Sequence, residues 1–339
     1  MVLKNNNIIL GIETSFDDTS CAILKGNIIC SNITYTQKLH NEFKGVKPNL
    51  AYNLHLVKIY EIVRESIDKS KIKIKDINAI SYTKGPGLIG SLMVGENFSK
   101  SMALSLNIPL IGVNHIHGHI FSNFIYNREK IYPKFPYICF SLSGGHTKIF
   151  LIKNFLDIKE IGRTLDDSLG NLFDKLSIYL GFEYYNGPRK IEEQSKKGKF
   201  LYKFPIPKVK GLNFSFSGLI TYLKRFIKKN KKRINKKDLC KSFIETIFII
   251  LKDKIYKAIK KTKIKNLVIT GGVSYNEELN KKIKKISYKN KWKLYINKNK
   301  DVIKDNAAMI ALVGNIKYYY KYYDNYNTIS ISNLKSNKL

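Results

Sequence analysis

The sequence predicts an α/β protein of two lobes built on a duplicated unit, and three observations carry this prediction. A buried strand, a polar loop and a returning strand follow one another at residues 7–24. The same order returns further along, at residues 137–152. Between the two copies, strand-like and helix-like segments alternate, as they do in layered α/β folds. Repetition of a structural unit predicts two similar lobes, and we expect their loops to face each other across a cleft.

The segments between the two copies follow from apolar periodicity and glycine turns. Residues 28–33 predict a third strand after a Lys-Gly-Asn turn, and residues 50–68 have the spacing of an amphipathic helix. A strand expected at 77–82 is followed by a glycine-rich turn and a helix that ends near residue 105. The strand expected at 108–113 leads directly into a histidine-rich stretch.

In the second half of the chain, the starts of helices are predicted from their capping residues. Asp166 and Asp167 form an acidic cap before one helix, and Asp305 is the expected N-cap of another. Residues 267–270 predict a strand that runs into a Gly-Gly pair and then a helix, which suits a nucleotide at a sheet edge. The lysine-rich residues 326–339 contain no motif, and we expect them to be disordered.

The histidine-rich stretch is a candidate metal site. His115 and His119 are four residues apart, which places both imidazoles on one face of a helix, where they could hold one divalent ion. His117 would point elsewhere. The metalloprotease helix has a glutamate directly after its first histidine, but this chain has Ile116, so that interpretation lacks its general base. A purely structural turn rich in histidine remains the alternative.

Length and composition limit the class of protein. A chain of 339 residues can form two packed lobes. No run of 18 apolar residues occurs and no secretory signal is evident, so we expect a cytoplasmic protein without a membrane partner. The four cysteines lack CxxC spacing and are expected to be buried thiols of a reducing compartment: Cys21, Cys30, Cys139 and Cys240.

The net charge of +34 would suit a polyanionic partner such as RNA. Only six of the 60 basic residues are arginine, although arginine fits phosphate better than lysine does. Lysine, asparagine, isoleucine and tyrosine are all abundant and all have A/T-rich codons. Biased base composition therefore competes with RNA binding as the origin of the charge.

Taken in order, six motifs make the chain similar to the family of tRNA threonylcarbamoyladenosine transferases, called TsaD or Gcp in bacteria, over about residues 7 to 320. The motifs are Gly11 to Thr19, the pair His115 and His119, Ser143 to Thr147, Phe216 to Gly218, Gly271 to Asn276, and Asp305 to Ala311. The resemblance implies a two-lobed actin-like fold, of the sugar-kinase and Hsp70 type, with duplicated ribonuclease-H-like units. The N-terminal lobe would comprise residues 5–112 and 303–325, and the C-terminal lobe residues 113–302.

The resemblance also implies a set of site residues. One divalent ion, with Fe2+ favoured over Zn2+, would be held by His115, His119 and Asp305, a two-histidine, one-carboxylate set with open positions. The substrate-binding loop would consist of Ser141, Leu142, Ser143, Gly144 and Gly145. Further nucleotide and ribose contacts would come from Asp174, Gly187 and Asn276.

The implied reaction transfers a threonylcarbamoyl group from threonylcarbamoyl-AMP to the N6 amine of the adenosine 3′ of the anticodon, in tRNAs that read ANN codons. The mixed anhydride is already activated, so the weak amine needs positioning and charge stabilisation more than a covalent intermediate. Asp17 and His146 are the catalytic candidates. Asp17 could accept a proton from the amine, although a loop-capping role is equally open for it, and His146 would support the substrate loop. A paralogous TsaB-type subunit and a TsaE-type ATPase are the expected partners.

Several positions depart from the family pattern, and three of them lose or replace a carboxylate. The departures are His117 for Glu, Phe16 for Cys, Asn171 for Glu, Tyr185-Asn186 for Pro-Gly, and Asn49 for Glu. The metal ligands are all retained. The alternatives are a drifted, inactive subunit kept for binding, or an ATP-dependent phosphotransferase of the same fold, which would not need the three metal ligands.

Overall fold

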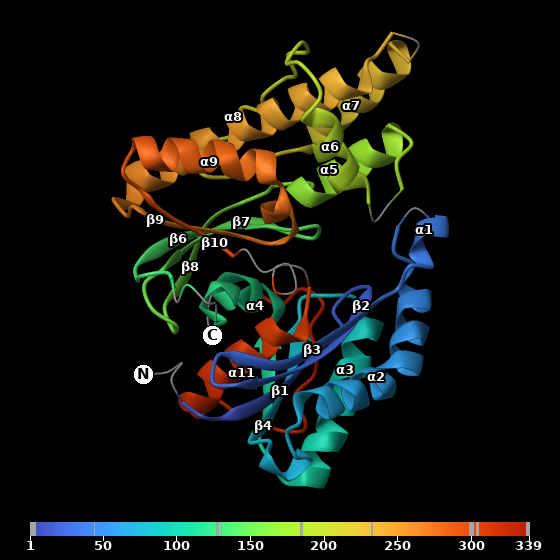
Figure 1. Cartoon of the computed structure of the whole chain (residues 1–339), viewed down its shortest axis with the longest axis vertical. Coiled ribbons are helices and arrows are strands. Elements are labelled where there is room, and N and C mark those ends of the chain that lie inside the picture. Colours follow the sequence, from blue (N-terminus) through green and yellow to red (C-terminus); the bar gives the residue numbers. More distant parts are fainter. Residues whose placement is uncertain are drawn as a thin grey trace. The chain divides into compact units, whose positions relative to one another are not determined.

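A computed structural model describes residues 5–43, 45–126, 129, 131–183, 186–231, 233–297, 302 and 305–336. The chain divides into two compact units (Figure 1). Unit 1 comprises residues 1–133, 155–158 and 297–339, and unit 2 comprises residues 134–154 and 159–296. The expected boundary after residue 112 differs from this division, because the segment that follows it packs on a helix of unit 1, as described below.

Unit 1 contains a mixed sheet of five strands in the order β3-β2-β1-β4-β5. The strands are β1 (Ile8–Glu13), β2 (Asp18–Lys25), β3 (Ile28–Thr36), β4 (Ala79–Gly85) and β5 (Leu110–Asn114). The first three form an antiparallel meander, and β4 and β5 continue the sheet in parallel to β1. The predicted turn at Gly26, with a φ of 62°, joins β2 to β3 and confirms the hairpin expected there.

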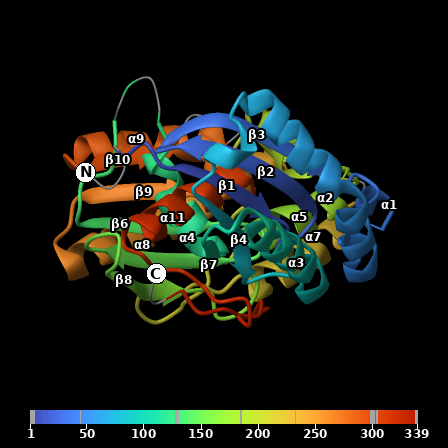
Figure 2. The same ribbon diagram turned by 90° about the horizontal axis from the view of Figure 1, so that it is seen from below.

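Side chains along β1 alternate between the two faces of this sheet, and each face packs against a different layer of helices. Leu10 and Ile12 join an apolar core with α2 (Pro48–Ser70) and α3 (Ile89–Leu106), which pack side by side (Figures 1 and 2). The opposite face packs on α11 (Ala307–Tyr319). Gly11 lies on that face, where an added Cβ would be 2.6 Å from the carbonyl oxygen of Ala307, so only glycine allows this close approach.

Helix α4 (His115–Phe121) and the short turn η2 (Ser122–Phe124) follow β5 and also pack on α11. This packing keeps the histidine stretch in unit 1, where the expected lobe boundary would have assigned it to the other lobe. The remaining short helices of unit 1 are α1 (His40–Phe43) and η1 (Ile74–Asp76).

The expectation of a disordered C-terminal tail is wrong for residues 326–336. Backbone groups of this segment bond to the turn between β4 and α3, through Ile331 N to Lys84 O at 2.8 Å and Gly87 N to Ser332 O at 3.1 Å. The side chain of Asn114 donates to Lys335 O at 3.0 Å. These bonds use main-chain groups of the tail, so its side-chain composition gave no signal of order; residues 337–339 lie outside the described part.

Unit 2 repeats the architecture of unit 1. Its five strands are β6 (Tyr137–Leu142), β7 (Thr147–Ile152), β8 (Ile158–Arg163), β9 (Asn266–Thr270) and β10 (Lys293–Ile296). Their order is β10-β9-β6-β7-β8, with β6 antiparallel to β7 and parallel to β9. Read from β8, this is the order found in unit 1, which confirms the duplicated α/β unit.

Helices of unit 2 share an apolar core with one face of its sheet, where Phe140 and Leu142 meet Phe243 and Ile247. They are α5 (Leu169–Tyr179), α6 (Gly187–Ser195), α7 (Ser217–Lys229), α8 (Lys236–Thr262), α9 (Glu277–Lys289) and the turn η3 (Gly272–Tyr275) (Figure 1). In the described part of the chain, none of the helices combines the length and the apolar composition that a bilayer-spanning segment requires.

Two predicted helix caps are wrong by one or two residues. Ser168, and not the Asp166–Asp167 pair, caps α5, because its hydroxyl accepts from Asn171 N at 3.1 Å. Asp166 instead accepts from the backbone N–H of Phe216 at 2.7 Å, just before α7. Asn306, and not Asp305, caps α11. The correction matters for Asp305, because its carboxylate is then available for another role.

Candidate active site

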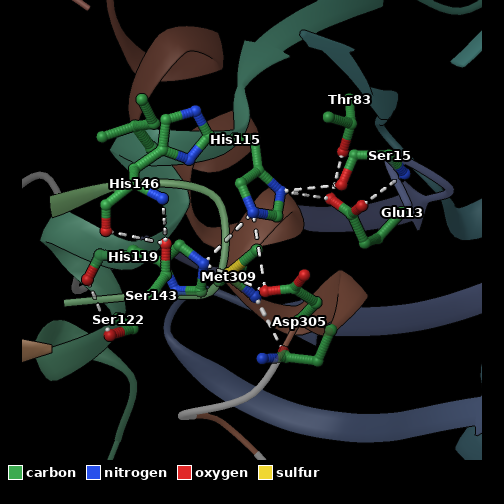
Figure 3. Close-up of polar contacts among 12 residues, drawn as sticks. Glu13, Ser15, Thr83, His115, His119, Ser122, Ser143, His146, Asp305 and Met309 are labelled. Carbon is green, nitrogen blue, oxygen red and sulfur yellow. Dashed lines mark hydrogen bonds and ion pairs between the residues drawn. The ribbon is translucent and has the colours of Figure 1, made fainter. Parts of the chain in front are cut away.

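The metal candidate is built where β5 runs into α4. Asn114 ends the strand, and its side chain caps the helix by accepting from Ile116 N at 2.9 Å. Helical geometry then places His115 and His119 one turn apart on one face, as predicted. Both imidazoles are buried, and their Nε2 atoms are 3.1 Å apart (Figure 3).

Asp305 completes this group from the residue before the N-cap of α11. Its Oδ1 lies 3.0 Å from His119 Nε2 and 3.5 Å from His115 Nε2 (Figure 3). The first turn of α11 is fixed on the sheet by a hydrogen bond from Ala307 N to Ser20 Oγ at 2.9 Å. The structure therefore brings together the three residues that the resemblance implied, all of them within unit 1.

The spacing of these atoms fits one metal ion. Bonds of about 2.1 Å, at angles between octahedral and tetrahedral, separate neighbouring ligand atoms by about 3.0–3.4 Å. The three separations here are 3.0, 3.1 and 3.5 Å. Two imidazoles and one carboxylate are also a donor set that zinc and ferrous iron both accept. The residues present therefore fit a divalent ion.

The ionisable side chains around His115 shift one another's pKa values. Burial alone would lower the pKa of His115, but the negative charges of Glu13 and Asp305 raise that pKa well above its usual value. Burial alone would raise the pKa of Asp305, but the charge of His115 and hydrogen bonds from both histidines hold it well below its usual value. Both shifts favour the charged forms of the two side chains, which stabilise each other.

His117 takes no part in this group and points elsewhere, as predicted. Its ring is buried, and its Nε2–H donates to Ser336 O at 3.1 Å, in the C-terminal segment. Asp17, the predicted proton acceptor, is half-buried in the loop after β1, and its carbonyl oxygen accepts from Gln37 N at 3.1 Å. Its catalytic role stays a prediction.

The predicted substrate loop lies in unit 2, between β6 and β7. Ser141 and Leu142 end β6, and Ser143 closes the turn to His146 through Ser143 N to His146 O at 2.8 Å and His146 N to Ser143 Oγ at 3.1 Å. The N-terminus of α5 holds the loop from the side, since Gly170 N donates to Ser143 O at 3.2 Å and the hydroxyl of Ser168 donates to Gly144 O. His146 takes part in this turn through its main chain, and the role predicted for its side chain stays a prediction.

The other three predicted contacts lie on elements next to this loop. Asp174 is half-buried on α5, and Gly187 starts α6, where an added Cβ would be 2.3 Å from Ser177 Cβ of α5. Asn276 caps α9 by accepting from Leu279 N at 2.9 Å. Helix α5 packs on α6, and both α5 and β6 contact η3. These residues therefore all have structural roles or neighbours within unit 2, and their substrate contacts stay predictions.

The departures from the family pattern fall at different kinds of position. Phe16 is 41% exposed, and Asn49 is exposed near the start of α2. Asn171 has a local partner, because its amide donates to Asp167 Oδ1 at 2.5 Å. Tyr185 lies outside the described residues, whereas Asn186 is the residue before α6.

Sequence reasoning missed one residue of the metal region, Glu13. The chain has three carboxylates between residues 13 and 18, namely Glu13, Asp17 and Asp18, and the prediction of a proton acceptor fell on Asp17. The structure instead places Glu13 against His115, with Oε2 3.0 Å from Nδ1 (Figure 3). The available signal was periodicity: Glu13 is two residues from Gly11 and so lies on the same face of β1.

Two mixed sheets with one strand order define a two-lobed actin-like fold, and the group formed by Asp305 and the buried His115 and His119 gives it a candidate metal centre. Solved structures of other proteins have a fold similar to that of this chain. HypF of T. kodakarensis has a TM-score of 0.64 at 17% identity over 94% of this chain and 48% of that one. Component A of the Acidaminococcus fermentans (R)-2-hydroxyglutaryl-CoA dehydratase has a TM-score of 0.54 at 13% identity over 93% and 99%.

The sequence comparison is more specific. The model of the family "tRNA N6-adenosine threonylcarbamoyltransferase" (TsaD) matches residues 28–312. Relatives of that name include proteins of Riemerella anatipestifer, 42% identical over 98% of both chains, and of Thermosipho africanus, 43% identical over 97% of this chain and 99% of the other. The chain belongs to the tRNA N6-adenosine threonylcarbamoyltransferase family.

Proposed function

We propose that this chain transfers a threonylcarbamoyl group from threonylcarbamoyl-AMP to the N6 amine of the adenosine 3′ of the anticodon, in tRNAs that read ANN codons. Membership of the family over most of the chain carries the proposal. The His115, His119 and Asp305 group supports it, because a phosphotransferase of the same fold would have no need of these ligands.

His115, His119 and Asp305 would hold one divalent ion. When bound, such an ion supplies positive charge for oxygens that become more negative during acyl transfer. Fe2+ is the metal that we favour, with Zn2+ as the alternative, because two histidines and one carboxylate with open positions are typical of non-haem iron sites. Metal analysis of protein purified without added metal would distinguish the two.

The AMP half of the substrate would lie at the loop of residues 143–145. Added Cβ atoms at Gly144, Gly145 and Gly272 would meet nothing within 4 Å, so each backbone has open space beside it. Such glycines let main-chain N–H groups approach phosphate oxygens closely. Gly272→Val would fill that space without a clash inside the protein. Loss of AMP binding in this variant, measured by calorimetry at unchanged melting temperature, would support the position of the nucleotide.

Proton transfer from the amine needs an acceptor, and Asp17 is our candidate. Asp17→Asn should lower the rate of transfer and leave metal content and AMP affinity unchanged. If Asp17 only shapes the loop, the same variant should lower the melting temperature without a specific effect on the rate.

The partners that we propose are tRNA, a paralogous TsaB-type subunit and a TsaE-type ATPase, in the cytoplasm. An apolar groove of about 540 Å³ between α2 and α3, lined by Leu56, Met93 and Phe98 among others, offers the subunit a docking surface. Leu56→Glu should abolish co-elution with that subunit in gel filtration. Asn53→Glu adds the same charge to an exposed position of α2 outside the groove and should not.

Nucleoside mass spectrometry tests the proposed reaction. Cells depleted of their own transferase should regain threonylcarbamoyladenosine in tRNA when this chain is expressed with its partners. Restoration by the wild-type chain but not by His115→Ala is the expected result. No restoration in the presence of all partners would indicate an inactive subunit or another reaction.

A further inference from the structure

Glu13 is a buried carboxylate beside the candidate metal centre. It is the last residue of β1, in the middle of the sheet of unit 1 between β2 and β4, and only 1% of it is exposed. It lies on the same face of β1 as Gly11, which packs against α11. The strand therefore directs this carboxylate towards the layer that contains α11 and α4.

Ordered donors hold both oxygens of Glu13. Oε1 accepts from the backbone N–H of Ser15 at 2.6 Å, and Oε2 accepts from the hydroxyl of Thr83 on β4 at 2.5 Å (Figure 3). Oε2 also lies 3.0 Å from Nδ1 of His115. Two strands and the following loop thus fix the carboxylate before any ligand binds. A rigid partner of this kind is what an orienting contact requires.

We propose that Glu13 is a positioning residue for the metal ligand His115, an inference that rests on the metal site of the proposed function. A carboxylate can only accept, so it requires a proton on Nδ1 of His115. The Nε2 lone pair is then directed to the point shared with Nε2 of His119 and Oδ1 of Asp305. Histidines that bind metals usually donate their other ring N–H in this way, which fixes the ring and makes it a stronger ligand.

The neighbouring Ser15 is a weaker candidate for the same role. Its Oγ lies 3.2 Å from His115 Nδ1, but a hydroxyl can donate as well as accept and so does not select one tautomer. The other carboxylates of the loop have different surroundings: Asp18 accepts from Thr36 Oγ1 on β3, and Asp17 lies in the half-buried turn. Among the three carboxylates that the sequence places here, Glu13 is the one in contact with His115.

The test compares Glu13→Gln with a matched control, Asp324→Asn. Asp324 is a partly buried carboxylate of unit 1 that, like Glu13, has ordered donors: it accepts from Gly112 N at 2.6 Å and Lys84 Nζ at 2.8 Å. Zn2+ affinity is measured by competition with a chelator, and the visible spectrum of the Co2+-loaded protein reports ligand geometry. Glu13→Gln should bind Zn2+ about 10- to 100-fold more weakly and alter the Co2+ bands. Asp324→Asn should change neither.

Two further variants complete the experiment. Ser15→Ala should change the Zn2+ affinity less than about threefold. Thr83→Val removes one hydrogen bond to Glu13 and should weaken Zn2+ binding to an intermediate degree. If Glu13→Gln does not fold, the Zn2+ affinity of Thr83→Val tests the inference in its place. Wild-type Zn2+ affinity and an unchanged Co2+ spectrum in Glu13→Gln would make Glu13 merely structural and overturn the inference. A wild-type chain that binds no metal would overturn the metal site itself, a separate result.

Discussion

Substitution of Gly170 by alanine should move the proposed substrate loop of unit 2, residues 143–145. An added Cβ would lie 2.5 Å from Gly144 Cα and 2.6 Å from both Gly144 N and Ser143 O, whereas ordinary contact begins at 3.4 Å. The loop must therefore retreat by roughly 1 Å. The bond from Gly170 N to Ser143 O, now 3.2 Å, would then be lost, at a cost of about 1 kcal/mol. Overpacking adds about 1–3 kcal/mol.

The displaced loop should weaken binding and transfer as well as stability. A displacement of about 1 Å in a positioning element can cost on the order of 100-fold in rate, so we expect AMP affinity to fall about 10-fold and transfer about 100-fold. Calorimetry with AMP and nucleoside analysis measure the two quantities.

Gly162→Ala is the control for this prediction. Its Cβ would be 2.5 Å from Leu212 O, an equal clash elsewhere in unit 2, so it should lower stability and leave AMP affinity unchanged. Wild-type affinity in Gly170→Ala, or an equal loss of affinity in Gly162→Ala, would refute the link between this loop and the nucleotide.

Three further predictions follow from unit 1 and from the charge. In chelator, the stability that the raised pKa of His115 contributes is fully present below the ordinary pKa of histidine and is lost as pH rises through the raised pKa. Thermal melts should show this loss in the wild type and not in His115→Asn, whereas a flat profile in the wild type would contradict it. Truncation after Asn325 removes the bonds to Glu96, Gly87 and Asn114 and should lower the melting temperature by several degrees; an unchanged melting temperature would mean that the tail adds nothing. Affinity for tRNA should fall steeply with salt, with a slope of several units at about 0.7–0.9 per phosphate contact, and a flat response would attribute the +34 charge to base composition.

The sequence was sufficient for eight of the ten strands that the structure describes and for the repeated hairpin unit, whereas β8 and β10 were not predicted. Period-two apolar patterns and glycine turns are local signals, and they identified the hairpins at Gly26 and at Gly144–Gly145 before any tertiary contact was known. The i,i+4 spacing of His115 and His119 likewise led to a correct prediction, because α4 begins at His115 and both imidazoles lie on one face of it. Asp305, in contrast, came from the family resemblance, since nothing local indicates that it meets α4.

Two of the failures share a physical cause, which is competition between similar side chains for one role, and the third has a different cause. Asp305 and Asn306 are both of residue types that cap helices well, and in the structure Asn306 is the N-cap of α11. Glu13 and Asp17 are both carboxylates near the end of β1, and only the packing of β1 and of α4 on α11 shows which one meets His115. The tail is held through main-chain groups. Every sequence has these groups, so they give no signal from which the order of the tail could be predicted.

Metal content is the most direct measure of the central claim, that His115, His119 and Asp305 hold one ion for acyl transfer. Elemental analysis should find close to one metal per wild-type chain and almost none in His119→Ala, with His117→Ala near the wild-type value because its ring contacts Ser336 O instead. Full occupancy in His119→Ala, or a loss confined to His117→Ala, would contradict the assignment.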